Sequence, residues 1–461
     1  MKAYIMLKIR FLIRSFSIGC LFIMHAYCSD PDDIMTPVKQ TGSSTAIEFT
    51  PGQFMSQRQA RILTRENFET HFEPSIVESW GIDWSLLTNQ TLAYDCPEKA
   101  SSVSFLTNRL KERLRKCKDG DFLDFFDKII GIKTAMEAVH LDRLDDKSID
   151  YFSSLFPNST VETDIKKSGV QLGETVSVTL QTGEKLKYYV KTHSEGRLSS
   201  KSSAAKLVAP EELMVYRILQ YAGVGCESHF FQRSPVDVYI ATLDATHNGT
   251  FRLFKDVITE ETKYGESLWG MLGIINNFPS ANDFNGLEFT FNDALSQNFI
   301  HQMATLDILT RILRLQDLLN NPENFGFLQL SGSHPILRVI DFRVLDAKEF
   351  RIAESDFRGF LVGNGLYNYA ASHRTMRFVL RERSRDKRIE TALQMFSQDP
   401  LLSIVDHINH AYSDVCKYIL EQPEVFAEHQ ETLMSQLNSY RESILENASY
   451  FNSCLHDRTI T

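Results

Sequence analysis

The stretch of residues 311–344 constrains the fold most, because its apolar pattern changes within a short distance. A helical stripe of apolar side chains covers residues 292–319 and runs out into a polar loop. Two apolar strands follow at residues 325–330 and 336–340, with a Gly-Ser turn between them. The stretch therefore predicts a long buried helix that leads into a β-hairpin.

Polar side chains stand at the ends of this hairpin. Asn324 directly precedes the first strand, and Asp341 directly follows the second. An Asn and an Asp on neighbouring strand ends supply the oxygen ligands that Mg²⁺ prefers. Asp317, seven positions before Asn324, is the nearest carboxylate that could act as a base beside them. The alternative is an Asx-rich turn that caps the hairpin and carries no chemistry.

A second hairpin is predicted upstream of this stretch. Residues 174–180 and 185–191 alternate between apolar and polar side chains on either side of a Thr-Gly turn. The second strand ends in Lys191, and a lysine at such a position can carry its ammonium group to nucleotide phosphates. Residues 237–244 and 250–258 are predicted to form two further strands.

A helix is predicted at residues 210–223, with Pro near its start and Gly at its end. Glu211 and Glu212 both lie in its first turn. Either glutamate could form an ion pair with Lys191, or both could simply interact favourably with the helix dipole. In the N-terminal part, helices are predicted at residues 102–117 and 121–140, followed by a connector at residues 145–163.

Two segments carry a resemblance to a known family: residues 320–327, Asn-Asn-Pro-Glu-Asn-Phe-Gly-Phe, and residues 340–342, Ile-Asp-Phe. They resemble the atypical branch of the protein-kinase fold that includes HipA-type and phosphoinositide kinases. The resemblance covers about residues 169–344, where the hairpin, strand lysine, helix glutamate, long helix, Asn loop and Asp follow in kinase order. It implies an α+β, two-lobed protein-kinase-like fold with a helical N-terminal extension and a helical C-terminal region.

The resemblance also implies cofactors and residue roles. The cofactors would be ATP and Mg²⁺ or Mn²⁺. Lys191 would contact the α- and β-phosphates of ATP and would be held by Glu212 or, alternatively, Glu211. Asn324 and Asp341 would bind the metal ion.

The catalytic base and the phosphate loop depart from the family pattern. Asp317 would lie near the acceptor hydroxyl, although its distance from Asn324 exceeds the H-R-D-x-x-x-x-N spacing. For the phosphate loop we favour the segment after the strand lysine, where Ser199 and Ser200 add hydroxyl donors. The alternative is the glycine-containing segment at residues 169–173, and either would present backbone N–H groups to phosphate.

These features predict an enzyme that transfers the γ-phosphoryl group of ATP to a hydroxyl on a protein, a lipid or a small molecule. Two alternatives stay open: a pseudokinase that has lost its base, and a secreted effector or binding protein whose polar loops are only turns. The basic segment at residues 374–388 is a candidate surface for an anionic substrate. A net charge of -10 over 461 residues argues against a general nucleic-acid binder.

The N-terminus has the pattern of a secretion signal, with a basic region, a short apolar run and a small-x-small site that ends at Cys28. Secretion or export is therefore expected, with no membrane span after cleavage, and a signal anchor is the alternative. Cys96 and Cys117 are the best candidates for a local disulfide. The expected domains are a signal peptide at 1–28, a flexible segment at 29–55, a helical region at 56–160, a small lobe at 161–260 and a large lobe at 261–461.

Overall fold

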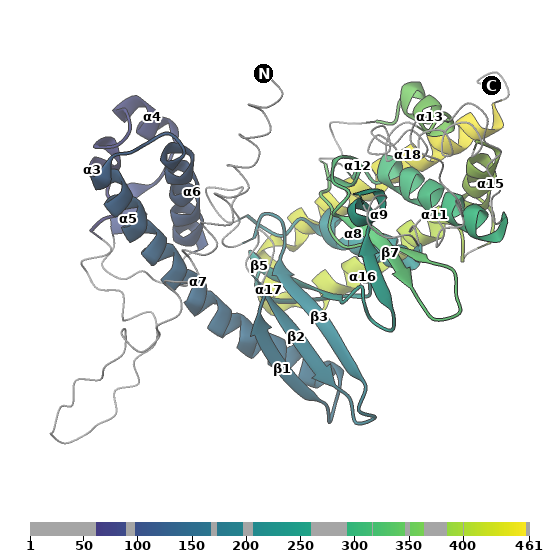
Figure 1. Ribbon diagram of the computed structural model, residues 1–461, viewed down its shortest axis with the longest axis horizontal. Coiled ribbons are helices and arrows are strands. Elements are labelled where there is room, and N and C mark those ends of the chain that lie inside the picture. The colour runs from purple at the N-terminus through teal and green to yellow at the C-terminus, as the bar shows by residue number, and fades with distance from the viewer. Residues whose placement is uncertain are drawn as a thin grey trace. The chain divides into compact units, whose positions relative to one another are not determined.

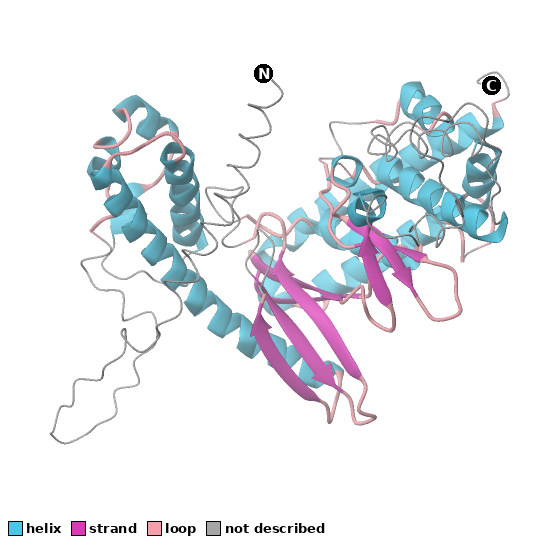
Figure 2. Cartoon of the chain, viewed as in Figure 1, coloured by secondary structure: helices cyan, strands magenta, loops and turns pink. Residues whose placement is uncertain are grey.

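The computed structural model describes residues 61–88, 97–166, 173–196, 206–259, 293–315, 317–345, 351–363, 385–399 and 401–457. All of them belong to one compact unit, Pro51–Thr461. Helices and strands both contribute, and the strands form two separate antiparallel sheets (Figure 1, Figure 2). The fold is therefore of the mixed α+β class.

The first helices are short, and the last of this region is long. Their bounds are α3 (Arg65–Glu69), α4 (Pro74–Ser79), α5 (Trp84–Thr88), α6 (Pro97–Leu114) and α7 (Gly120–Leu155). Their aromatic and aliphatic side chains form a core of their own, in which Phe68 packs against Trp84 and Phe125. This part of the chain thus buries its apolar side chains without using the sheets.

The predicted connector at residues 145–163 is wrong, because α7 continues to Leu155. Leu144, Ser148 and Phe152 recur every fourth residue and are fully buried, so the same helix face stays covered beyond residue 140. A strand, β1 (Thr160–Ile165), then occupies the end of the predicted connector. The predicted disulfide is also wrong, since Cys117 is a free thiol; Cys96 lies outside the described residues.

The larger sheet has five strands in the order β1-β2-β3-β5-β4, all antiparallel. Besides β1, the strands are β2 (Gly173–Thr179), β3 (Lys185–Thr192), β4 (Ser228–Ser234) and β5 (Asp237–Leu243). One face packs against α7 through Val178, Tyr188 and Val190, which share a core with Phe152. Val238 and Ile240 of β5 belong to the other face and join a different core, formed with α8 (Pro210–Tyr221). The sheet therefore separates two sets of packed side chains.

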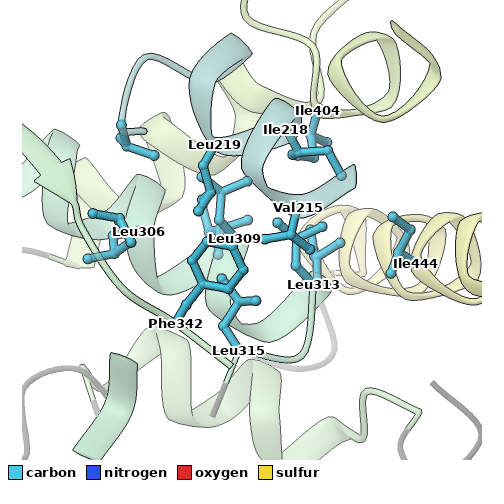
Figure 3. Close-up of a cluster of buried hydrophobic side chains, with 14 of the residues drawn as sticks. Val215, Ile218, Leu219, Leu306, Leu309, Leu313, Leu315, Phe342, Ile404 and Ile444 are labelled. Atoms are coloured by element: carbon cyan, nitrogen blue, oxygen red, sulfur yellow. The ribbon is translucent and has the colours of Figure 1, made fainter. Parts of the chain in front are cut away.

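The second core is the largest, and it collects helices from the C-terminal half. They are α11 (Asp293–Ile312), α13 (Glu354–Leu361), α15 (Arg385–Met395), α16 (Ile404–Leu420), α17 (Pro423–Phe426), the 3-10 helix η6 (Ala427–His429) and α18 (Gln430–His456). Figure 3 shows α8 side chains such as Val215 and Leu219 packed with Leu309 and Leu313. The helix α8 thereby joins the five-stranded sheet to the helical C-terminal region.

Two arginines, one largely covered and one fully buried, connect the helices of this region. Arg311 Nε donates to Asp307 Oδ1 at 2.9 Å within α11, and its NH1 group donates to the Asp356 carbonyl at 2.7 Å. Arg388 is fully buried and donates to the Leu361 carbonyl. Arg388 is therefore not part of an exposed basic surface for an anionic substrate, and residues 374–384 lie outside the described residues.

The smaller sheet has three strands in the order β6-β7-β8. They are β6 (Thr250–Leu253), β7 (Phe325–Gln329) and β8 (Ile336–Val339), so the hairpin predicted after the long helix forms. The strand predicted at 250–258 is wrong in its second half, because α9 (Phe254–Thr259) replaces it. Phe254 is fully buried and stacks on Phe325 with ring centroids 4.8 Å apart, so the start of α9 packs against β7. In the part of the chain that the structure describes, no helix is long and apolar enough to cross a membrane.

Candidate active site

Lys191 lies at the end of β3 on the face of the sheet that does not pack against α7. Its neighbour Val190 is fully buried in the core with α7, and alternation along the strand turns Lys191 the other way. The Lys191 ammonium donates to Asp341 Oδ1 at 2.8 Å. Since these residues are 150 positions apart in the sequence, the fold brings together the two ends of the predicted site.

The helix α8 adds two side chains to this ion pair. Glu212 is only 4% exposed, and its Oε2 accepts a hydrogen bond from the Ser194 backbone N–H at 2.9 Å. Tyr216 follows one helical turn later on the same helix face. Its ring centroid lies 5.7 Å from the Lys191 ammonium and 4.5 Å from the ring of Phe342. The ammonium group is thus surrounded by oxygen-bearing side chains from α8 and from the end of β8.

The pair predicted between Lys191 and Glu212 takes a different form. The direct salt bridge of Lys191 is to Asp341, and Glu212 acts on the ammonium through its charge. Glu211 has a different environment: it lies near Tyr440, whose pKa is raised by burial and then by the Glu211 charge. Of the two candidate glutamates, Glu212 is therefore the one that belongs with Lys191.

Burial and charge oppose one another at this cluster. Burial lowers the pKa of Lys191, but the attraction of Tyr216, Asp341 and Glu212 outweighs it and leaves the pKa raised. Asp341 is partly exposed, so desolvation raises its pKa by less than the nearby Lys191 ammonium lowers it, and the net direction is down. For Glu212, burial exceeds the opposing effect of Lys191, so its pKa is raised. Lys191 and Asp341 therefore stabilise one another's charged forms, whereas burial disfavours the charge of Glu212.

Asn324 and Asp341 meet because β7 and β8 pair with Phe325 opposite Val339. The Asn324 carbonyl accepts hydrogen bonds from the Ile340 and Asp341 backbone N–H groups, at 2.8 and 3.2 Å. The backbone thus fixes the two predicted metal ligands side by side at one end of the hairpin.

Asn321 holds the Asn324 side chain. The Asn321 amide donates to Asn324 Oδ1 at 2.9 Å, and the Asn321 carbonyl accepts from the Asn324 backbone N–H at 3.1 Å. From the sequence, Asn321 was expected in a bulged turn or, with Asn320, as an alternative occupant of the base position, and its contact with Asn324 was not predicted. Its signal was the Asn-x-x-Asn spacing, which is typical of a turn closed by an Asx side chain.

The donor set fits a magnesium ion. Asn324 offers an amide oxygen and Asp341 a carboxylate, the oxygen types that Mg²⁺ takes together with substrate phosphates. The Asp341 side chain is 56% exposed, so a ligand can reach it from solvent. These two residues would hold the ion, and the ion would supply positive charge to the phosphate oxygens.

Asp317 is the first residue of a short helix, α12 (Asp317–Asn320), and is half-buried. The long helix α11 ends at Ile312, and Arg314 adopts a left-handed conformation with φ of 61°. Between Asp317 and Asn324 the chain has more residues than the kinase pattern, and a separate turn of helix after α11 accommodates them. The role of Asp317 as a base stays a prediction.

The predicted phosphate-binding residues Ser199 and Ser200 lie outside the described residues. Tyr216 was missed by the sequence analysis, although a residue one turn after Glu212 is expected on the same helix face. Lys166, the residue after β1, was missed as well; burial and the charge of Lys191 lower its pKa, and the charge of Asp341 opposes them.

The order of these parts along the chain is that of a kinase-like α+β fold. A strand hairpin, the Lys191 strand, the Glu212 helix, two further strands, the long helix α11 and the β7–β8 hairpin follow in turn. The lysine and the Asp341 carboxylate also meet in space, as the nucleotide site of such a fold requires.

No protein-family model matches the chain, and no curated protein matches it in sequence. Among solved structures it is similar to the proinflammatory kinase CtkA of Helicobacter pylori, with 12% identity and a TM-score of 0.30 over 63% of this chain and 96% of that one. It is also similar to an ethanolamine kinase of Plasmodium vivax, with 12% identity and a TM-score of 0.26 over 75% of this chain and 95% of that one. Both likenesses are distant, and the kinase-like interpretation of the site rests on Lys191, Glu212, Asn324 and Asp341.

Proposed function

We propose that the chain is an atypical kinase-like phosphotransferase that binds ATP with Mg²⁺ or Mn²⁺. Its acceptor would be a hydroxyl on a protein, a lipid or a small molecule. The supporting observation is the 2.8 Å contact between Lys191 and Asp341, which unites a strand of the larger sheet with the end of the β7–β8 hairpin. Secretion or export, which follows from the N-terminal signal pattern, is part of the same proposal.

Each residue of the cluster has a task in this proposal. Lys191 would release part of its contact with Asp341 and bind the phosphates, while Glu212 keeps the ammonium in place. Asn324 and Asp341 would hold the metal ion, which would supply positive charge next to the phosphates. Because phosphoryl transfer depends mainly on positioning and on charge, these contacts supply most of what the reaction needs.

The proposal is tested by thermal-shift titration with ATP, with and without Mg²⁺. The wild-type protein should be stabilised by ATP, and more strongly when the metal ion is present. Asp341→Ala should abolish the metal-dependent part of the shift, because it removes the charged metal ligand. Asp146→Ala, which removes an exposed carboxylate on α7, is the matched control and should behave as wild type. A metal-dependent shift that survives in Asp341→Ala would exclude the assigned role.

A pseudokinase is the second candidate, and the placement of Asp317 favours it. This carboxylate begins a separate turn of helix, and along the sequence its spacing from Asn324 exceeds that of the kinase pattern. For an active enzyme we expect Asp317→Asn to lower phosphoryl transfer by about 10²-fold or more while ATP binding stays within about twofold. Turnover at the wild-type rate in Asp317→Asn would show that another group is the base. Nucleotide binding with no turnover in the wild type would identify a pseudokinase.

A further inference from the structure

Three residues form one row across the first three strands of the larger sheet. The Lys166 backbone N–H donates to the Gly173 carbonyl at 3.2 Å, which extends the β1–β2 pairing by one residue beyond Ile165 and Glu174. Gly173 is in turn paired with Lys191. Residues directly opposite one another in antiparallel strands point to the same face. Lys166 and Lys191 therefore share the face that carries Asp341.

Gly173 leaves the space between these two lysines free of a side chain. A Cβ atom at this position would lie 2.1 Å from the Val190 carbonyl oxygen, so close pairing of β2 with β3 requires glycine. Strands in a sheet are about 4.8 Å apart, which places the Lys166 and Lys191 backbones about 10 Å from each other. The flexible stems of two lysines can reach one polyphosphate across that distance.

The charge around Lys166 is consistent with a binding role. Its side chain is half-buried, and among the described residues no carboxylate lies within 4.0 Å of its ammonium group. Burial and the repulsion of Lys191 lower the pKa of Lys166, while Asp341 opposes them. A polyanion placed between the two ammonium groups would remove this repulsion.

We propose that Lys166 is a second phosphate-binding cation, which together with Lys191 binds the polyphosphate chain of the nucleotide. This inference rests on the proposed function, since it assigns a further residue to the same site. Lys191, already paired with Asp341, serves the phosphates nearest the metal ligands. Lys166, next to the edge strand β1, binds the phosphates of the nucleotide that extend past Gly173 toward that strand. The pair makes the site selective for a polyphosphate over a nucleoside.

The test compares Lys166→Met with wild type by isothermal titration calorimetry, using ATP, adenosine and, without metal, inorganic tripolyphosphate. Loss of one charge-assisted contact should weaken binding of ATP and of tripolyphosphate by about tenfold to hundredfold. Adenosine binding should not change. Lys166→Arg, which keeps the charge, should stay within about threefold of wild type.

Lys187→Met is the matched control, because Lys187 lies on the same face of β3 but pairs with Asp244. It should bind all three ligands as wild type does. The unfolding midpoint of each unliganded variant shows whether the fold is intact, and Lys166→Arg separates loss of charge from loss of packing.

The binding results show whether the inference about Lys166, the proposed function or both fail. If Lys166→Met binds ATP and tripolyphosphate as tightly as wild type, the inference is overturned while the proposed function stands. If wild type binds tripolyphosphate but not ATP, and Lys166→Met loses that binding, the inference holds and the proposed function fails. If wild type binds neither ligand, both are overturned.

Discussion

The two faces of the five-stranded sheet each bury a glutamate, and the surroundings of the two side chains differ. Glu174 of β2 is 1% exposed and lies beside Asp145 and Ser148 of α7. Burial, reinforced by Asp145 and opposed by Ser148, raises the pKa of Glu174 to about 9. On the other face Glu212 is also buried, but the Lys191 ammonium acts against the effect of burial. Burial of a glutamate is therefore common to both faces, and what distinguishes the face with the candidate site is the Lys191 cation beside the glutamate.

This contrast explains why the candidate site lies on the α8 face of the sheet, beside the core that Val238 and Ile240 form there. Towards α7 the sheet presents Val176, Val178 and Val190, and Glu174 is tolerated among them because it carries a proton. Towards α8 and β8 it presents Lys191, whose charge is balanced by neighbouring oxygens. The ammonium of Lys191 can exchange its contact with Asp341 for a contact with a negatively charged ligand. The neutral side chains on the α7 face offer no such charge to a ligand.

Replacing Lys191 with Met is the strongest way to test the contrast. The change removes the direct partner of Asp341 and also the cation that opposes the effect of burial on Glu212, and removing one member of a buried group of charges costs about 3–5 kcal/mol. Urea unfolding at about pH 7.5 measures this loss, which should shrink at lower pH as Glu212 takes up a proton. Lys187→Met, at a half-exposed position paired with Asp244, should cost less than about 1 kcal/mol. Equal losses in the two variants would refute a special role for the Lys191 position.

The second prediction concerns Glu174→Gln. The pKa of Glu174 is about 9 in the folded protein and 4.5 in its ordinary state, so the folded chain holds a proton that the unfolded chain releases between these values. Rising pH in this window therefore favours the unfolded chain and lowers the stability of wild type.

Glu174→Gln removes this linkage, so its advantage over wild type should grow as pH rises. From about pH 5.5 to about pH 7.5 the difference in unfolding free energy should increase by about 3 kcal/mol, at 1.36 kcal/mol for each pH unit. Denaturant unfolding across this range measures it. A constant difference would mean that Glu174 ionises normally. Nucleotide binding should not change, because Glu174 faces α7.

The third prediction compares the two ends of the β2–β3 hairpin. Gly173→Ala forces a Cβ atom against the Val190 carbonyl and should cost about 1–3 kcal/mol. It should also weaken nucleotide binding, since Gly173 is paired with Lys191. Gly183→Ala at the far turn has open space around it but a φ of +82°, and should cost about 1–2 kcal/mol with no effect on binding. Thermal unfolding and ATP titration of both variants measure these effects, and weaker ATP binding in Gly183→Ala would contradict the prediction.

Much of the site could be predicted because its residues stand at the ends of elements with clear local patterns. The alternation at residues 174–180 and 185–191 became β2 and β3, so Lys191 was placed correctly at a strand end. Asn324 and Asp341 flank the predicted hairpin in the structure as well. What failed was the length of elements: α7 runs to Leu155, and β6 stops at Leu253, because burial against distant parts of the chain decided where they end.

The sequence by itself determined which residues alternate, which helix carries Glu212 and which side chains follow the strands, since these depend on neighbours within a few positions. Only the tertiary structure decided that Asp341, and not Glu212, makes the direct contact with Lys191, and that Lys166 shares their face. It also placed β5 between β3 and β4. The physical reason is that strand pairing joins residues far apart in the chain. The periodicity of the sequence predicts the face of a strand or helix on which a side chain lies, but it does not predict the residue that the side chain contacts there.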